Sequence, residues 1–395
     1  MSRWPNKYVI GLTGNIAVGK SLVRQMLQHL GAYTVDADGL AHHAMSPGAP
    51  AYKPVVENFG QMILNADKTI NRAALGQIVF SNPVALEKLE TLTHPVISQA
   101  INTLVSRAKQ PVVVIEAIKL LEGDLKSAVD QVWVVDASPK SQYIRLVGKR
   151  KMSEDQAKQR ILAQGPQAEK LKSASVVIKN DGDVEETWKQ VQAAWNKLQA
   201  SIKPSTPTPA STATATPAQA TATASSGASV DTSGITIKRG MPGNADAIAE
   251  FINTHSGQSL SRMDVMMSFG DKSYLLAHDS ADVVNGLMGF QVENLITRVN
   301  AIYMDATSDK APIIHALVAA IEEKSTELQS EVGFFFLPNN SDTAIVQSFL
   351  NQGYEATTVK EIKIPAWREA VQETFSDGMQ ILMKKLREDR VLKPI

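Results

Sequence analysis

The sequence contains no cysteine among its 395 residues. This absence excludes both a disulfide framework and a thiolate metal site, and it is consistent with a reducing compartment. An excess of charge is missing too, because 40 basic and 40 acidic side chains cancel to a formal charge of zero. Without a basic excess, a general nucleic-acid-binding role has no electrostatic support.

Long apolar runs are also absent. No uninterrupted apolar stretch is long enough to cross a bilayer, and the first residues, Met1–Lys7, lack the apolar core of a secretory signal. We therefore expect a soluble, cytoplasmic protein that does not associate with a membrane.

The length of the chain predicts two domains of ordinary size. Between them, the segment from Ser201 to Gly234 is almost wholly Ser, Thr, Ala, Pro and Gly, with Lys203 and Asp231 as its only charges. This composition has no apolar periodicity that could offset the entropy of ordering the segment. We predict a first domain over residues 1–199, a disordered linker over 200–234, and a second domain over 235–395.

Short apolar segments alternate with helical patterns before the linker. The segments expected to form strands are Tyr8–Thr13, Tyr33–Val35, Pro111–Ile115, Val132–Val135 and Val176–Ile178. They are continuously apolar, as expected of strands that helices cover on both faces. Strands separated by helices predict a parallel sheet with right-handed crossovers, in which ligands bind beyond the carboxyl ends of the strands.

After the linker the pattern changes to a mixed α/β arrangement. Helices are expected around residues 247–251, 313–324 and 343–351, and the polar turn at 279–282 predicts a hairpin. The expected strands of this part are Ile235–Lys238, Ser273–Ala277, Gly286–Val292, Ala301–Met304, Val332–Leu337 and Met379–Met383. We therefore predict a second α/β domain with its own core.

One motif in the first domain carries specific chemistry. Residues 14–21 read G-N-I-A-V-G-K-S and satisfy the phosphate-loop pattern G-x-x-x-x-G-K-S/T. The glycines let consecutive backbone N–H groups curl around phosphates, and the following helix adds the positive end of its dipole. Lys20 is expected to reach the β- and γ-phosphates of ATP and to take part in catalysis, and the Ser21 hydroxyl to ligate Mg²⁺. The residues expected to contact ATP here are Gly14, Asn15, Ile16, Ala17, Val18, Gly19, Lys20, Ser21 and Leu22.

Two carboxyl groups, Asp36 and Asp38, follow the second expected strand. Residues two apart in an extended chain point the same way, so both carboxylates could face one pocket and one could accept a proton. Aspartate is equally common as the residue that caps the start of a helix. The spacing alone leaves both interpretations open.

From about Tyr8 to Gly182 the chain resembles the dephospho-coenzyme A kinases. The residues that carry the resemblance are Gly11–Gly14, Val35–Asp38, Asn71-Arg72, Ile78–Phe80, Thr93–Ile97, Arg160-Ile161 with Gln164, and Asn180–Gly182. The resemblance implies a nucleotide-kinase-like fold with a helical acceptor region and a lid. It implies transfer of the ATP γ-phosphate to the ribose 3′-hydroxyl of dephospho-coenzyme A, with Asp38 as the base.

The resemblance also implies side chains that contact the two small-molecule substrates. A cationic lid over the triphosphate fits a reaction that depends on positioning and charge neutralisation. The candidates for ATP beyond the loop are Arg145, Lys149, Arg150 and Asn180. The candidates for the acceptor are Asp36, Arg72, His94, Glu116 and Arg160, with His94 at an expected helix start before Pro95.

Two departures from the family pattern stand out. Residues 116–122 read E-A-I-K-L-L-E where the family has D-x-P-L-L-F-E, and Lys149 occupies a lid position expected to be arginine. Lysine cannot make a planar two-pronged contact, so Arg145 or Arg150 is expected to take that role. A kinase for a different nucleotide-like acceptor and a nucleotide-binding regulator of the second domain therefore stay open as alternatives.

The layout of residues 235–395 resembles the GNAT-type acetyltransferases. The similarity lies in the opening strand and helix, the hairpin, a fourth strand leading into a helix, and Phe349 with Gly353-Tyr354 before a last strand. That family holds the pyrophosphate of acetyl-coenzyme A on a glycine-containing loop, whereas the corresponding segment here contains Asp309, Lys310 and Pro312 but no glycine. Acetyl-coenzyme A is the candidate ligand, and both a transferase and a non-catalytic sensing or partner-binding module are open. The sequence does not predict the oligomeric state.

Overall fold

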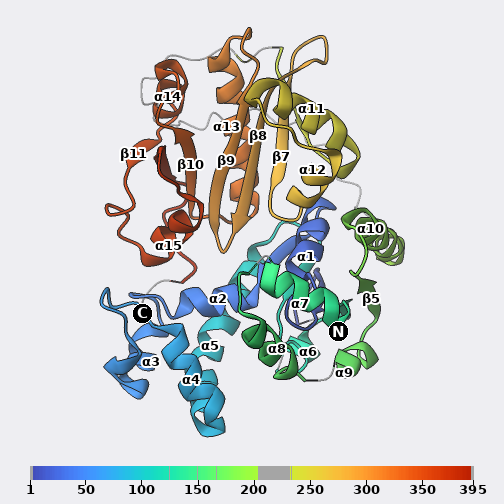
Figure 1. Cartoon of the computed structure of the whole chain (residues 1–395), viewed down its shortest axis with the longest axis vertical. Coiled ribbons are helices and arrows are strands. Elements are labelled where there is room, and N and C mark those ends of the chain that lie inside the picture. The colour runs from blue at the N-terminus through green and yellow to red at the C-terminus, as the bar shows by residue number, and fades with distance from the viewer. Residues whose placement is uncertain are drawn as a thin grey trace, which may run out of the picture.

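The computed structural model describes residues 3–123, 125–148, 150–165, 167–202, 232 and 234–392. Within them the chain forms two α/β domains, one above the other in Figure 1. The predicted linker lies almost wholly outside the described residues. Its first two residues belong to the last helix of the N-terminal domain, which ends at Ser201.

The N-terminal sheet has five parallel strands in the order β2-β3-β1-β4-β5. The strands are β1 Tyr8–Thr13, β2 Tyr33–Asp36, β3 Val112–Glu116, β4 Gln131–Asp136 and β5 Val176–Lys179. All five agree with the predicted strands to within one residue at each end. The prediction of a parallel sheet is confirmed.

Helices cover both faces of this sheet (Figure 1). Alternate residues of β3 point to opposite faces, so Val114 packs with α1 and α10 while Ile115 packs with α5. Helices α3 and α4 stand apart, below α2 in Figure 1, and have a small core of their own. The helices are α1 Lys20–His29, α2 Ala37–Ala44, α3 Tyr52–Phe59, α4 Arg72–Ser81, α5 Pro83–Arg107, α6 Leu125–Ala128, α7 Pro139–Gly148, α8 Glu154–Leu162, α9 Gln167–Lys172 and α10 Val184–Ser201.

The C-terminal sheet has seven strands in the order β11-β12-β10-β9-β8-β7-β6. Strands β9 and β10 run parallel and every other neighbouring pair is antiparallel. The strands are β6 Thr236–Arg239, β7 Ser273–His278, β8 Val284–Glu293, β9 Ile296–Met304, β10 Val332–Pro338, β11 Glu355–Thr357 and β12 Met379–Lys385. The predicted mixed α/β domain is confirmed, and the order of elements expected from the GNAT resemblance is present.

Five helices of the described residues pack on this second sheet. They are α11 Ala245–Ser256, α12 Arg262–Ser268, α13 Lys310–Glu327, α14 Thr343–Leu350 and α15 Pro365–Thr374. Helices α12 and α15 and the short strand β11 were not predicted from the sequence. Helix α15 buries Ala366, Trp367 and Val371 against the second domain.

The two domains share one hydrophobic core. Val23 and Met26 of α1 belong to the same cluster as Val265 and Phe269 of the C-terminal domain. Beside them, the buried His29 ring contacts the Phe269 carbonyl through Nε2, at 3.0 Å, and the Arg239 guanidinium through Nδ1, at 3.1 Å. Burial lowers the pKa of His29 to about 3, and an arginine can only donate, so the neutral ring carries its proton on Nε2. Contacts of this kind fix how the domains meet.

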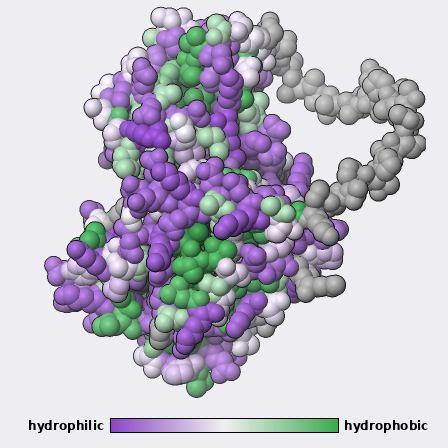
Figure 2. All heavy atoms as spheres, turned by 90° about the vertical axis from the view of Figure 1, so that its right-hand side faces the viewer, coloured by the Kyte–Doolittle hydropathy of each residue, from purple (hydrophilic) through white to green (hydrophobic). Residues whose placement is uncertain are grey.

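The outer edge of the first sheet is partly open to solvent. Strand β5 ends the sheet, and its Val177 is 39% exposed. Figure 2 shows apolar residues gathered on the lower half of the face where β5 and α10 lie. This edge lies at the far end of the strand order from β2, which leads into the site described next.

Candidate active site

The phosphate loop connects β1 to α1 and has the curvature that its sequence predicts. Gly14, Ala17 and Gly19 adopt positive φ angles of 151°, 58° and 98°. A Cβ atom at Gly14 would lie 2.4 Å from the Val135 carbonyl oxygen, so only glycine fits this close approach. No side chain caps the start of α1, whose cap residue is Gly19. The helix therefore presents backbone N–H groups that a phosphate can accept from.

Two side chains predicted to contact ATP hold the carbonyl side of this loop. Asn180 donates from Nδ2 to the Val18 oxygen at 2.7 Å, and Arg145 donates to the oxygens of Ala17 and Val18 at 3.1 Å each. Arg145 also donates to the backbone oxygen of Asn180. Both residues are thus brought to the loop. Their contact with the nucleotide stays a prediction.

Lys20 lies buried at the start of α1, and its Nζ donates to the Asn15 oxygen at 3.2 Å. Burial lowers the pKa of Lys20, while the neighbouring carboxylates of Glu116 and Asp38 oppose that effect. The exposed Arg150 is close enough to lower the pKa further. Lys149 lies outside the described residues.

Two glutamines between the end of α8 and the start of α9, here called the lid segment, accept hydrogen bonds from backbone N–H groups of the phosphate loop. Neither was proposed as a site residue from the sequence. Gln164 Oε1 accepts from the Ile16 N–H at 2.6 Å, and Gln167 Oε1 accepts from the Asn15 N–H at 3.1 Å. Gln164 was noticed only as part of the family resemblance, and Gln167 carries no local signal because it follows the motif-bearing segment on a polar helix. Both show that the segment around α9 lies directly over the loop.

The acidic pair takes two different positions. Asp36 ends β2 and caps α2, accepting from the Gly39 N–H at 2.9 Å, whereas Asp38 lies in the first turn of that helix. The extended backbone that would aim both carboxylates the same way is therefore not present. Asp38 accepts from the Ile118 N–H at 3.1 Å, and burial, followed by the negative charge of Asp36, raises its pKa to about 6. Its side chain is nevertheless exposed, because it faces an open cavity.

The backbone N–H and C=O of Ile118 join three parts of the site. Its N–H binds Asp38, and its oxygen accepts from Thr13 Oγ1 and from Lys170 Nζ, both at 3.1 Å. Burial, followed by the nearby charge of Lys20, lowers the pKa of Lys170. Lys170 is therefore a further cation of the site, and no motif or spacing singled it out beforehand.

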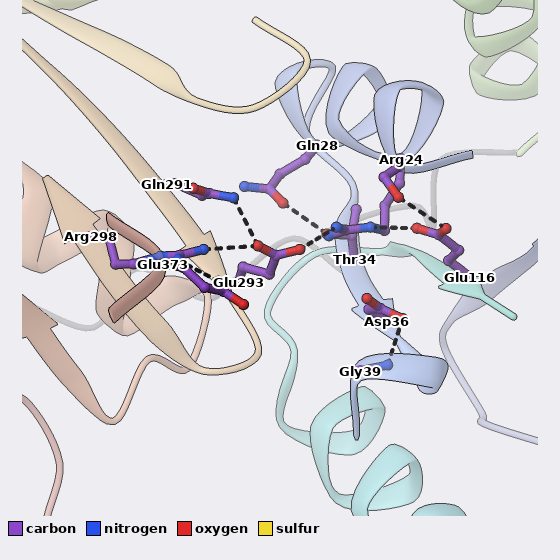
Figure 3. A network of polar contacts seen from close by, with 11 residues as sticks. Arg24, Gln28, Thr34, Asp36, Gly39, Glu116, Gln291, Glu293, Arg298 and Glu373 are labelled. Carbon is purple, nitrogen blue, oxygen red and sulfur yellow. Dashed lines mark hydrogen bonds and ion pairs between the residues drawn. The ribbon is translucent and has the colours of Figure 1, made fainter. Parts of the chain in front are cut away.

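Glu116, predicted to bind the acceptor, instead faces the first helix (Figure 3). It is buried and pairs with Arg24 Nε at 2.7 Å, and it accepts from Ser21 Oγ at 3.3 Å. Burial raises the pKa of Glu116 and Arg24 opposes this. Arg24 lies one helical turn after Lys20, on the same face of α1, which is the signal that could have found it.

Oxygen atoms of Ser21 and Glu116 meet the preference of Mg²⁺ for one or two protein oxygens beside substrate phosphates. Within the part of the chain that the structure describes, no group of three or more His, Asp or Glu side chains could hold a metal by itself. The residues present therefore fit a metal that a nucleotide brings with it, and do not form a self-sufficient metal cage.

The remaining predicted acceptor residues are dispersed. Arg72 begins α4 and contacts His42 of α2, close to Asp38. The prediction that His94 lies at a helix start is wrong. His94 lies exposed in the middle of the 25-residue helix α5, because Pro95 is accommodated inside that helix. Arg160 lies exposed near the end of α8. The structure thus brings Arg72 to the cavity beside Asp38, whereas His94 and Arg160 do not line it.

The start of α13 does not suit the pyrophosphate of acetyl-coenzyme A. Asp309 caps the helix, accepting from the Ala311 N–H at 3.2 Å, and the next residue is Pro312, which has no N–H. Lys310 lies 3.8 Å from the carboxylate of Asp342. A carboxylate already occupies the place where an anion would bind.

Among the described helices, none combines the length and the apolar character needed to traverse a membrane.

Comparison with known proteins places the first half of the chain. The family model described as dephospho-CoA kinase matches residues 8–186. The dephospho-CoA kinase of Geobacter metallireducens is 46% identical over 192 residues, which is 48% of this chain and 96% of that protein. The dephospho-CoA kinase of Moorella thermoacetica is 39% identical over 199 residues, 49% of this chain and 94% of that protein.

A solved acetyltransferase aligns with another part of the chain at low similarity. The ribosomal-protein-S18-alanine N-acetyltransferase of Escherichia coli is 12% identical with a TM-score of 0.31, covering 40% of this chain and 96% of that one. The kinase matches have much higher sequence identity, 46% and 39% against 12%. Since the aligned half of this chain is 39–46% identical to these kinases and covers nearly their whole length, the chain belongs to the dephospho-CoA kinase family.

Proposed function

We propose that the protein transfers the γ-phosphate of ATP to the ribose 3′-hydroxyl of dephospho-coenzyme A, giving coenzyme A and ADP. Membership of the kinase family supports this function. The single observation that carries it is the position of Asp38, between the buried phosphate-loop lysine and an open cavity of about 420 Å³. A carboxylate in that place can accept a proton from an alcohol on one side while a phosphate is held on the other.

The phosphate loop supplies binding and charge neutralisation. Its N–H groups and Lys20 hold the β- and γ-phosphates, and the exclusion of water from the buried Lys20 strengthens that contact. Ser21, with Glu116 nearby, would hold the Mg²⁺ that accompanies the nucleotide, and that ion would supply neutralisation of phosphate charge. Arg24 keeps Glu116 in place from the next turn of α1.

Asp38 accepts the proton of the attacking hydroxyl. Its pKa, raised to about 6, leaves it largely ionised at neutral pH yet close enough to that pH to take up a proton. The Ile118 N–H holds one carboxylate oxygen, Oδ2, so the other oxygen is available to the hydroxyl.

The lid segment rearranges when the nucleotide binds. Gln164 and Gln167 accept from the same loop N–H groups that phosphates require, so these two side chains must leave. Arg145, Arg150 and, after this rearrangement of its helix, Lys170 supply positive charge to the transferred group.

The C-terminal domain does not act as an acetyltransferase in this proposal, because Asp309 caps the helix that would bind the pyrophosphate. We place the reaction in the cytoplasm, where ATP is supplied. ATP and the acceptor are the only partners that the proposal requires.

A coupled ADP-release assay with a panel of acceptors tests the proposal. We expect ADP release that depends on dephospho-coenzyme A, with a product carrying a 3′-phosphate by mass spectrometry. Turnover with another nucleotide-like acceptor alone would show a different kinase, and ATP binding without turnover would show a regulator.

A further inference from the structure

The cavity beside Asp38 is walled by both domains. Seven of its fourteen lining residues belong to the C-terminal domain, so the kinase half alone would leave it open on that side. Those residues come from two places, the β8–β9 hairpin and helix α15. Helix α15 lies directly above α2 in Figure 1.

The hairpin is fixed against the kinase domain by an ionic chain that Figure 3 shows. Glu293, at the end of β8, lies 3.5 Å from Arg24 of the kinase domain and 3.0 Å from Arg298 of β9. The following residue, Asn294, approaches α2 so closely that a Cβ atom at Gly39 would lie 2.3 Å from its Oδ1. Gly39 is the neighbour of Asp38, so the hairpin meets the kinase domain at the catalytic helix.

Helix α15 is held rigidly above the same cavity. Its Trp367 and Val371 are buried in the second domain, and Trp367 meets the Phe334 ring edge-on. Arg298 donates to the Ala370 oxygen at 3.1 Å and to Glu373 at 2.9 Å, which fixes the last turn of the helix.

A second cavity, of about 520 Å³, continues from the first. Met45, Arg72 and Glu369 line both, so the two form one cleft between α15 and the helical region of the kinase domain. Helix α15 contributes Pro365, Arg368, Glu369 and Gln372 to the second cavity, at the spacing of one helix face. The combined size suits a cofactor-sized ligand.

The chemistry of the cleft changes along its length. Asp38 and His42 lie in the first cavity, Arg72 lies where the two cavities meet, and the far cavity adds apolar side chains such as Leu75 and Phe80 among polar ones. Dephospho-coenzyme A presents a ribose hydroxyl, then a diphosphate, then a long and largely uncharged arm. The order of groups along the cleft is the order along the ligand.

We propose that the C-terminal domain is a structural part of the acceptor site, with helix α15 forming the wall along which the acceptor binds. This inference rests on the proposed function. Glu369 contributes to specificity in this arrangement. Its carboxylate lies 2.9 Å from His42 Nε2 and interacts with the charge of the neighbouring Arg72, so it competes with an anionic acceptor for that guanidinium.

The first test fills the cleft from the second domain. Ala370 lines the first cavity, and Ala370→Phe is expected to raise the KM for dephospho-coenzyme A about tenfold or more, with the KM for ATP unchanged. Ala344→Phe, on the exposed start of α14, is the matched control and should change neither constant. Thermal unfolding of both variants shows whether the fold is intact.

The second test removes a charge while keeping the side-chain volume nearly constant. It tests the role of α15 in acceptor binding even if Ala370→Phe does not fold. Glu369→Gln removes the competing carboxylate and is expected to lower the KM for dephospho-coenzyme A about threefold to fivefold. Glu323→Gln on the exposed side of α13 is its control.

Unchanged acceptor KM values in both variants, or equal changes in the KM for ATP, would overturn the inference. The proposed function is tested separately, by the turnover of the unsubstituted protein with dephospho-coenzyme A. If that protein used a different acceptor, the KM for that acceptor would still report on the wall.

Discussion

The two domains each contain a strand–loop–helix unit, and the two units differ in whether the start of the helix is free to bind an anion. In the kinase domain β1 leads through a loop into α1, and in the second domain β9 leads through a loop into α13. No side chain caps α1, whose cap residue is a glycine in the left-handed region, whereas the carboxylate of Asp309 caps α13. A strand–loop–helix unit is therefore not by itself an anion site, because the N–H groups at the helix start must be free of a competing carboxylate.

The largest effect is expected where the uncapped loop meets its proton acceptor. Asp38→Asn removes the carboxylate that accepts the hydroxyl proton, and kcat should fall about 10³-fold with the KM for ATP little changed. Steady-state kinetics with dephospho-coenzyme A measures this. A kcat within tenfold of the unsubstituted protein would show that another group is the base.

The loop lysines of the two units give a direct contrast. Lys20→Ala should lower kcat about 10²-fold or more, because a buried cation that stabilises transferred charge is lost. Lys310→Ala, at the start of α13, should leave kinase activity unchanged, since Lys310 faces Asp342 at 3.8 Å and not a phosphate. Comparable losses in the two variants would contradict the contrast.

The acidic pair predicts the pH dependence of the kinase. Only the ionised form of Asp38 accepts a proton, so kcat/KM for the acceptor should fall as the pH drops through about 6. The charge of Asp36 raises the pKa of Asp38, so Asp36→Asn should move the acidic limb of the pH–rate profile to lower pH. Asparagine also caps helices well, which preserves the start of α2. An unmoved limb would mean that a different group titrates.

The smallest effect is expected at the capped helix. Asp309→Ala removes the acceptor of the Ala311 N–H and should lower the free energy of unfolding by about 1 kcal/mol. Chemical denaturation measures the loss, with kinase activity at low denaturant as the control. A gain in stability would show that Asp309 is not a stabilising cap.

Much of the fold followed from local patterns in the sequence. The five parallel strands were expected almost to the residue, because each is a continuous apolar run between helical segments. Helix α15 was missed. Its buried side chains pack on Phe334 and other residues of the second domain that lie far from it in the chain. The element that walls the cleft was therefore, like α12 and β11, not predicted from the sequence.

In the candidate site, too, residues defined by local spacing were predicted, whereas contacts between distant segments were not. The loop residues Gly14 to Ser21 were found from their spacing, and the observed φ angles match that motif. The partners of Asp38 and Glu116 were not found, because Ile118 and Arg24 lie 80 and 92 residues away in the chain. His94 was misplaced because Pro95 was taken as a helix start, while the structure carries the proline inside α5.

The sequence by itself determined the phosphate loop, the parallel sheet and the kinase family, because a loop's curvature and a strand's burial depend on residues that are neighbours in the chain. Only the tertiary structure decided that Asp36 caps a helix, that Glu116 binds Arg24 and that the second domain closes the cleft beside Asp38. The cap is local, but the other two features join segments remote in the chain, and their geometry exists only once both sheets and their helices have packed.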